Sequence, residues 1–127
     1  MILVDTSVWV RALRRQPSRE KVVVQALVDQ DLIATTDLVV AEVLQGANSE
    51  QDFQKLADRM QGPHFYHADE ELWWRAARLS FELKSRGLIT PLADLVIATV
   101  ALENGLEVYA IDDHFERVPG LKLHVPS

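Results

Sequence analysis

Cysteine is absent from the 127-residue chain, which removes several classes of site. Disulfide bonds, thiolate metal sites and thiol nucleophiles are excluded. No apolar run approaches the length needed to cross a bilayer, and Met1 leads directly into strand-like residues rather than into a signal peptide. We therefore expect a soluble protein that needs no membrane, and the lack of cysteine suits a reducing cytoplasm.

Positive charge is also scarce. The formal net charge is −6, with 13 Lys and Arg against 19 Asp and Glu, which excludes a uniformly positive surface for nucleic acids. Five of the 13 basic residues nevertheless lie between positions 11 and 21, where Glu20 is the only acid. They are Arg11, Arg14, Arg15, Arg19 and Lys21. Such a run is usually a solvated helix face, but its position soon after Asp5 also suggests a rim that contacts phosphate groups.

Strand-like and helix-like segments alternate along the whole chain, with no repeat or linker. Strands are predicted at residues 1–5, 32–35, 64–67, 107–111 and 121–125. Helices are predicted at 8–14, 18–29, 38–44, 49–60, 69–86 and 91–104. Strands separated by helices pair in parallel through crossover connections. The sequence therefore predicts one α/β domain over residues 1–127, a three-layer α/β/α sandwich around a mostly parallel sheet of about five strands.

Four carboxylates are placed within apolar surroundings: Asp5, Glu42, Asp94 and Asp112. A carboxylate in such a place is costly unless it is paired, protonated or bound to a metal. Asp5 and Asp112 each end a predicted strand, and ligands of open parallel sheets bind beyond the carboxyl ends of the strands. Glu42 and Asp94 lie in early turns of predicted helices. We expect all four to meet in one crevice.

Four converging carboxylates repel one another, and a divalent cation resolves that repulsion. Oxygen ligands without a Cys or His set favour Mg²⁺ or Mn²⁺ over zinc. Taken singly, each acid also fits an ordinary role, as a helix cap, a first-turn acid, a turn residue or the partner of a buried arginine. One metal site accounts for all four acids, so we predict that they are metal ligands and catalytic residues.

Four blocks of sequence around these acids resemble those of a PIN-domain protein, and more narrowly those of a VapC toxin. They span residues 2–10, 38–46, 90–101 and 108–121, in the order and spacing typical of the family. The resemblance implies a PIN-like fold and Mg²⁺- or Mn²⁺-dependent endoribonuclease activity on RNA. It also implies a homodimer and neutralisation by a cognate VapB-type antitoxin.

Position by position, the resemblance matches the family's acidic quartet to Asp5, Glu42, Asp94 and Asp112. Thr6 matches a hydroxyl often found beside the first acid. Ala110 stands where the family commonly has Thr or Ser, and Asp113 stands where it often has a basic or polar residue. Either Asp112 alone or the pair with Asp113 therefore faces the metal. We favour Asp112 because it directly follows the predicted strand.

Three other functions stay open at this point. A phosphatase with an aspartyl nucleophile would need a second acid where Ser7 stands. A DNA nuclease of the same fold would share the carboxylate chemistry. A binding module would use the acidic pocket to capture an arginine of a partner, with vestigial activity.

Four further side chains bear on the site or on assembly. His114 lies close to Asp112 in sequence and has no evident partner. Three tryptophans, Trp9, Trp73 and Trp74, are predicted to pack in the core or in a dimer interface rather than to stack on bases.

Overall fold

The computed structural model describes residues 1–126 and contains a parallel sheet with the strand order β3-β2-β1-β4. Its strands are β1 (Ile2–Val4), β2 (Ile33–Thr36), β3 (His64–Tyr66) and β4 (Glu107–Tyr109). The register pairs Val4 with Tyr109 and Thr36 with Tyr66, at the ends of their strands. Because every pairing is parallel, the carboxyl ends of the strands lie along one edge of the sheet.

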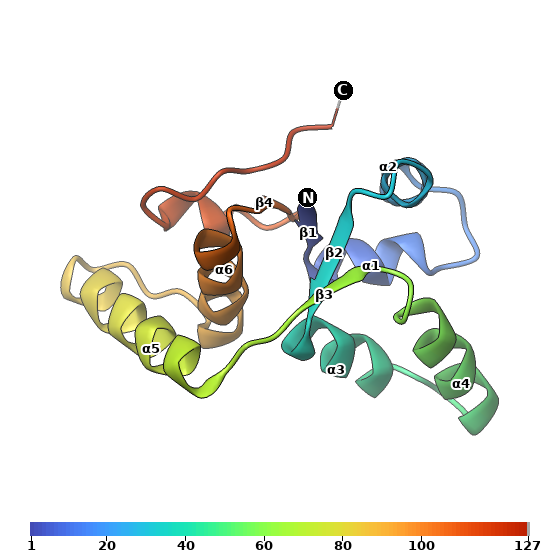
Figure 1. Cartoon of the computed structure of the whole chain (residues 1–127), viewed down its shortest axis with the longest axis horizontal. Coiled ribbons are helices and arrows are strands. Elements are labelled where there is room, and N and C mark those ends of the chain that lie inside the picture. The colour runs from blue at the N-terminus through green and yellow to red at the C-terminus, as the bar shows by residue number, and fades with distance from the viewer. Residues whose placement is uncertain (127) are drawn as a thin grey trace.

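Helices cover both faces of this sheet. They are α1 (Thr6–Ala12), α2 (Arg19–Asp29), α3 (Asp37–Gln45), α4 (Glu50–Arg59), α5 (Glu70–Ser85) and α6 (Leu92–Asn104). Figure 1 shows α5 and α6 on one side of the sheet and α1 to α4 on the other. The predicted three-layer α/β/α sandwich is therefore confirmed. None of the helices in residues 1–126 is long and apolar enough to cross a membrane.

The core lies on both faces of the sheet, and α6 forms much of it on one face. Every residue of α6 from Leu95 to Ala101 is buried, as expected for a helix that is apolar all round. All three residues of β1 are buried as well. The helix ends at Gly105, whose φ of +66° is the left-handed conformation that favours glycine. A buried strand and a buried helix thus fix the two segments that carry Asp5 and Asp94.

The C-terminal part of the chain differs from the prediction in two ways. The sheet has four strands rather than about five, because the segment predicted at 121–125 forms only a bridge between Leu123 and Val108. The side chains of Leu123 and Val125 are exposed, so no apolar face extends the pairing. In addition, β4 ends at Tyr109 and not at residue 111, since the Ile111 N–H lies 3.4 Å from the Ser7 hydroxyl instead of pairing in the sheet.

Candidate active site at the carboxyl edge of the sheet

Asp5 occupies the junction between β1 and α1. Its backbone N–H donates to the Tyr109 carbonyl of the neighbouring strand at 2.9 Å, and α1 begins at the next residue. The Asp5 carboxylate caps this helix: Oδ2 accepts from the Ser7 N–H at 3.2 Å and from the Ser7 hydroxyl at 2.6 Å. Only 4% of the residue is exposed. The capping role considered from sequence is thus real, and it holds the carboxylate inside the fold.

The surroundings of Asp5 disfavour its charged form. Burial raises the pKa of the Asp5 carboxyl above its ordinary value of 3.8. The hydrogen bonds from Ser7 lower this pKa and partly oppose the effect of burial, whereas the negative charge of Asp94 raises the pKa further. The influence of Asp94 means that the two carboxylates share one electrostatic environment. A cation placed between them would offset both the burial and the mutual repulsion.

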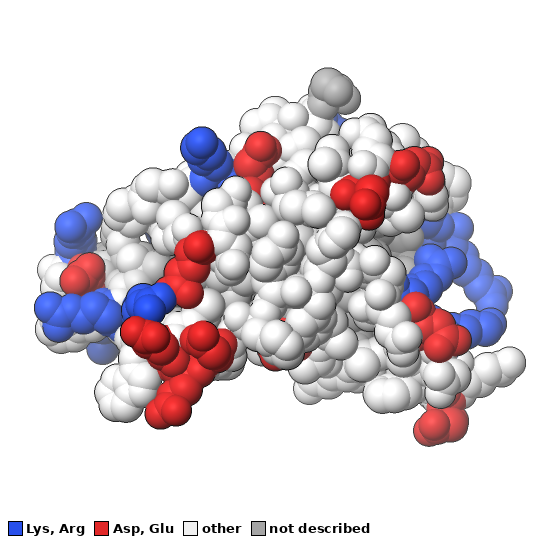
Figure 2. Space-filling view, viewed as in Figure 1, with Lys and Arg blue, Asp and Glu red and all other residues white. Residues whose placement is uncertain are grey.

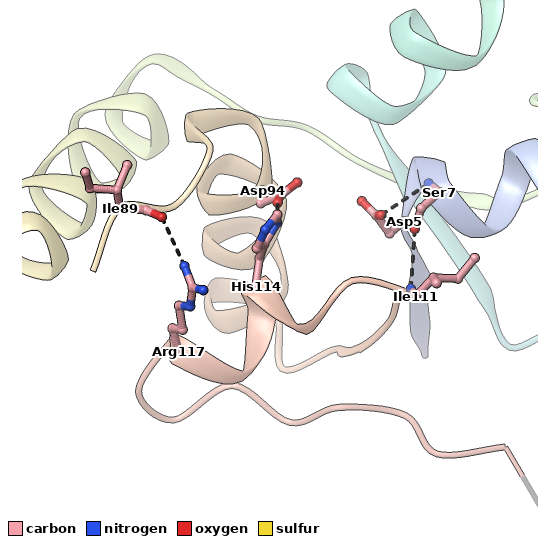
Figure 3. A network of polar contacts seen from close by, with 7 residues as sticks. All are labelled: Asp5, Ser7, Ile89, Asp94, Ile111, His114 and Arg117. Carbon is pink, nitrogen blue, oxygen red and sulfur yellow. Dashed lines mark hydrogen bonds and ion pairs between the residues drawn. The ribbon is translucent and has the colours of Figure 1, made fainter. Parts of the chain in front are cut away.

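Asp94 lies in the first turn of α6 and is bound by a histidine. His114 Nδ1 is 2.7 Å from Asp94 Oδ2, with 32% and 18% of the respective side chains exposed. Figure 3 shows this pair across from Asp5 and Ser7, at the same end of the sheet. The other Asp94 oxygen, Oδ1, accepts no hydrogen bond from residues 1–126. We expect it to be the oxygen that is free for a ligand.

His114 is itself held in place by the short 3-10 helix η1 (Asp113–Arg117). Phe115, the next residue, is 2% exposed and anchors η1 in the core. Arg117 donates to the Ile89 carbonyl at 3.0 Å, which ties η1 to the segment before α6 (Figure 3). Sequence reasoning missed the pair of His114 and Asp94, because twenty positions separate them and no local pattern links them.

Glu42 is joined to the same region through α1. It lies on α3, which begins directly after β2, and its Oε1 accepts from the Thr6 hydroxyl at 2.8 Å. Thr6 follows Asp5 in the chain, so neighbouring residues of α1 bind two different acids. The hydroxyl that sequence placed beside the first acid thus contacts Glu42.

Asp112 is placed differently from the other three acids. Asp112 is exposed, and its side chain does not cap η1 although it directly precedes that helix. Within residues 1–126 it forms no hydrogen bond with Ser7, Thr6 or His114, the residues that bind the other three acids. Asp112 and Asp113 both line a hollow of about 420 Å³ together with Arg11 and Arg19. The structure therefore links Asp5 and Glu42 through the adjacent residues Ser7 and Thr6, and it links Asp5 and Asp94 through their charges. Asp112 and Asp113 are exposed and line the hollow beside Arg11 and Arg19.

The side chains at this edge offer the oxygen ligands that a hard cation prefers. Carboxylate and hydroxyl oxygens predominate, and Mg²⁺ is usually held by one or two carboxylates together with water. In residues 1–126, no three His, Asp or Glu side chains are arranged so that they hold a metal by themselves. Asp5 and Asp94 fit a cation whose remaining ligands are water, and all four acids stay predicted ligands.

Comparison with known proteins identifies the family. The family model described as PIN domain matches residues 2–121. The chain belongs to the PIN-domain family. Ribonuclease VapC18 of Mycobacterium tuberculosis is 34% identical over 122 residues, which cover 93% of this chain and 87% of that protein.

Solved structures have the same PIN fold. VapBC2 of Rickettsia felis, bound to a DNA fragment from its promoter, matches with a TM-score of 0.81 at 24% identity and 98% coverage of both chains. A toxin-antitoxin complex from Klebsiella pneumoniae matches with a TM-score of 0.78 at 20% identity and 95% coverage of both chains. At these identities the likeness shows the fold alone.

This PIN domain carries one more acid at the carboxyl edge, and it has a structural role. Asp37 begins α3 directly after β2, and its Oδ1 accepts from the Ala68 N–H. Burial acts to raise the Asp37 pKa, but hydrogen bonds from the Ala68 backbone and from His67 outweigh it and hold the pKa below its ordinary value. Asp37 thus fastens the end of β3 to α3, and its lowered pKa contrasts with the raised pKa of Asp5.

Proposed function

We propose that this chain is a Mg²⁺- or Mn²⁺-dependent endoribonuclease and the toxin of a VapBC toxin-antitoxin pair. The observation that carries the proposal is the Asp5 carboxylate, buried at a strand end and electrostatically coupled to Asp94. The 34% identity to a VapC ribonuclease supports RNA as the substrate. A phosphatase and a plain binding module lack comparable support.

The residues of the site have separate roles in this proposal. Asp5 and Asp94 bind the cation most directly, and Glu42 and Asp112 complete the site directly or through water. When bound, Mg²⁺ or Mn²⁺ lowers the pKa of water and offsets negative charge on a phosphodiester. Ser7 and His114 orient the carboxylates of Asp5 and Asp94 by occupying one oxygen of each. Thr6 does the same for Glu42.

Partners follow from the same proposal. A VapB-type antitoxin is the proposed regulatory partner, and the cytoplasm, where RNA is available, is the proposed location. A homodimer is supported by large apolar side chains on the outside of α5 and after it. Trp74 is 73% exposed, Phe81 63% and Ile89 78%, and exposed apolar surface that is contiguous marks sites of protein association. Trp9, by contrast, packs in the core with 4% exposure.

Cleavage of cellular RNA by the purified protein tests the proposal. We expect cut RNA with added Mg²⁺ or Mn²⁺, none with EDTA, and no cutting of a DNA oligonucleotide of matching sequence. Asp5→Asn and Asp94→Asn should abolish the cuts, while Asp58→Asn on the exposed surface of α4 serves as the matched control. Cleavage that persists in EDTA or in Asp5→Asn would contradict the proposed site, and equal cleavage of DNA would contradict the substrate.

A further inference from the structure

A second hollow, away from the carboxylates, is lined by basic side chains. It has a volume of about 310 Å³ and lies between α1, α2 and the end of α4. The hollow is lined by four basic side chains, Arg14, Arg15, Lys21 and Arg59, and no acid of residues 1–126 lines it. Figure 2 shows Lys and Arg gathered at this side of the molecule, over the loop that joins α1 and α2. The positive surface is local in a chain whose net charge is −6.

Three of these cations have no carboxylate partner. Arg14, Arg15 and Arg59 are exposed and form no ion pair within residues 1–126. Arg11, nearby on α1, is instead paired with Glu20 at 3.0 Å. Lys21 donates to the Arg14 carbonyl. Unpaired guanidinium groups on one surface favour an anion with several oxygens, because each group can bind two phosphate oxygens at once.

The wall of the hollow also holds a donor that lacks an acceptor. Trp9 lines the hollow, and its buried indole Nε1–H has no acceptor among residues 1–126. Leaving such a group unpaired costs free energy. Because this nitrogen is shielded from solvent, the binding of an anion in the hollow falls to the basic side chains around it.

The basic surface continues to the acidic site. Arg14 and Arg15 also line an adjoining hollow of about 430 Å³, and Glu42 lies in the wall of that hollow. Glu42 is bound by Thr6, the neighbour of Asp5 in the chain. A strand whose scissile phosphate lies at the carboxylates therefore meets Arg14 and Arg15 as it passes Glu42.

We propose that Arg14, Arg15 and Arg59 form a binding site for the phosphodiester backbone of the RNA substrate, beside the carboxylates. The identity of the substrate rests on the proposed function. Phosphate contacts supply affinity that does not depend on base sequence and falls with added salt. Because the chain as a whole has a net charge of −6, this local positive site supplies the attraction that brings RNA to the acidic centre.

Binding in EDTA separates this site from catalysis. The probe is a fluorescein-labelled, single-stranded RNA of mixed sequence, followed by anisotropy at several salt concentrations with the full chain. The double variant Arg14→Ala/Arg15→Ala removes two contacts, so the slope of log K against log salt should fall by about 1.4. At about 0.15 M salt the Kd should then rise roughly tenfold. Arg59→Ala should give about half the change in slope.

The matched control is Lys84→Ala/Arg86→Ala, which removes the same charge at the exposed end of α5. It should leave both the slope and the Kd nearly unchanged. Equal weakening by both double variants, or none in Arg14→Ala/Arg15→Ala, would overturn the proposed site. Thermal melting of each variant shows whether it is folded, and Arg59→Ala gives an independent reading from a different element.

Two further arms define the ligand. A DNA duplex of the same length that binds more tightly than the RNA, and loses its binding in Arg14→Ala/Arg15→Ala, would overturn RNA as the occupant. RNA would also be overturned as the occupant if a polyglutamate peptide bound the wild type and lost its binding in Arg14→Ala/Arg15→Ala while RNA binding was retained. That result would indicate that the arginines bind an acidic segment of a protein. If the arginines are needed for RNA binding but the wild type cuts no RNA with Mn²⁺, the binding site stands and the proposed catalysis fails.

Discussion

Asp5 and Asp112 follow neighbouring strands of the sheet, but the two strand ends differ in construction. The strands pair in parallel, with Val4 opposite Tyr109. At Asp5 the helix begins immediately, and the carboxylate turns inward to cap it at 4% exposure. Asp112 comes only after Ala110 and Ile111, lies exposed and makes no capping bond. The two acids therefore differ both in the element that follows the strand and in their exposure.

This difference implies unequal roles for the two acids. Asp5 is held by Ser7 and coupled to Asp94, so its position is defined before any ligand binds. Asp112 has no such restraint and lies in a hollow with Arg11 and Arg19. We expect the two strand ends to respond differently to the same substitution.

The largest expected effect is on cleavage. Asp5→Asn should reduce the rate of RNA cleavage by more than about 100-fold, because a lost ligand removes several kcal/mol of stabilisation of the transition state. Asp112→Asn should reduce it by about tenfold, and Asp113→Asn by less than about twofold. Single-turnover cleavage with Mn²⁺ measures all three. Equal losses in Asp5→Asn and Asp112→Asn would contradict the contrast between the strand ends.

The next effect concerns His114, a positioning residue that acts through Asp94. His114→Ala should weaken Mn²⁺ binding by about 10- to 100-fold, the range for groups that orient metal ligands. His114→Asn should restore most of the affinity, because its amide places a donor near the position of Nδ1, while His114→Gln should not. Electron paramagnetic resonance of free Mn²⁺ measures the affinity. Identical behaviour of the Asn and Gln variants would show that the hydrogen bond to Asp94 is not the cause.

A smaller effect is expected on stability. Ser7→Ala removes the hydroxyl that donates to the buried Asp5 carboxylate, which should lower the free energy of unfolding by about 1.5 kcal/mol. Asp113→Ala at the other strand end should change it by less than about 0.5 kcal/mol, as for an ordinary exposed position. Urea unfolding with EDTA measures both. A larger loss in Asp113→Ala would reverse the comparison.

The smallest effect is a dependence on pH. The pKa of Asp5 is raised in the folded state, so its contribution favours folding below the unfolded value of 3.8 and is lost as the pH rises through the folded pKa. Asp5→Asn should therefore raise the melting temperature of the metal-free protein at pH 7 and change it less at pH 4. The measurement is the change in melting temperature that Asp5→Asn causes at pH 7, compared with the change that it causes at pH 4. A variant destabilised at pH 7 and not at pH 4 would contradict the raised pKa.

Local patterns were enough to predict most of the fold. Apolar periodicity located the buried elements such as β1 and α6, because a buried face dictates residue type along the element. Helix α4 and strand β3 have no buried residues and were located with the help of the turn residues Gly62 and Pro63 between them. Apolar periodicity failed at residues 121–125, where apolar residues alternate but Leu123 and Val125 stay exposed and a single bridge joins the segment to β4. The same pattern made β4 too long, since it does not register the hydrogen bond between Ile111 and Ser7.

The candidate site was predictable only in part. Asp5, Glu42 and Asp94 were selected because a carboxylate within apolar residues is costly, a property that sequence displays. The orienting contacts were not, since His114 meets Asp94, and Thr6 meets Glu42, only through the packing of separate elements. The placement of Asp112 depends on where β4 ends, which periodicity resolves to within two residues at best.

The most direct test of the central claim is a Mn²⁺ titration followed by electron paramagnetic resonance, with RNA cleavage measured on the same samples. The wild type and the Asp58→Asn control should bind Mn²⁺ and cut RNA, and Asp5→Asn and Asp94→Asn should lose both properties together. Cleavage that continues in a variant without Mn²⁺ binding would contradict the claim that these carboxylates form a metal-dependent ribonuclease site.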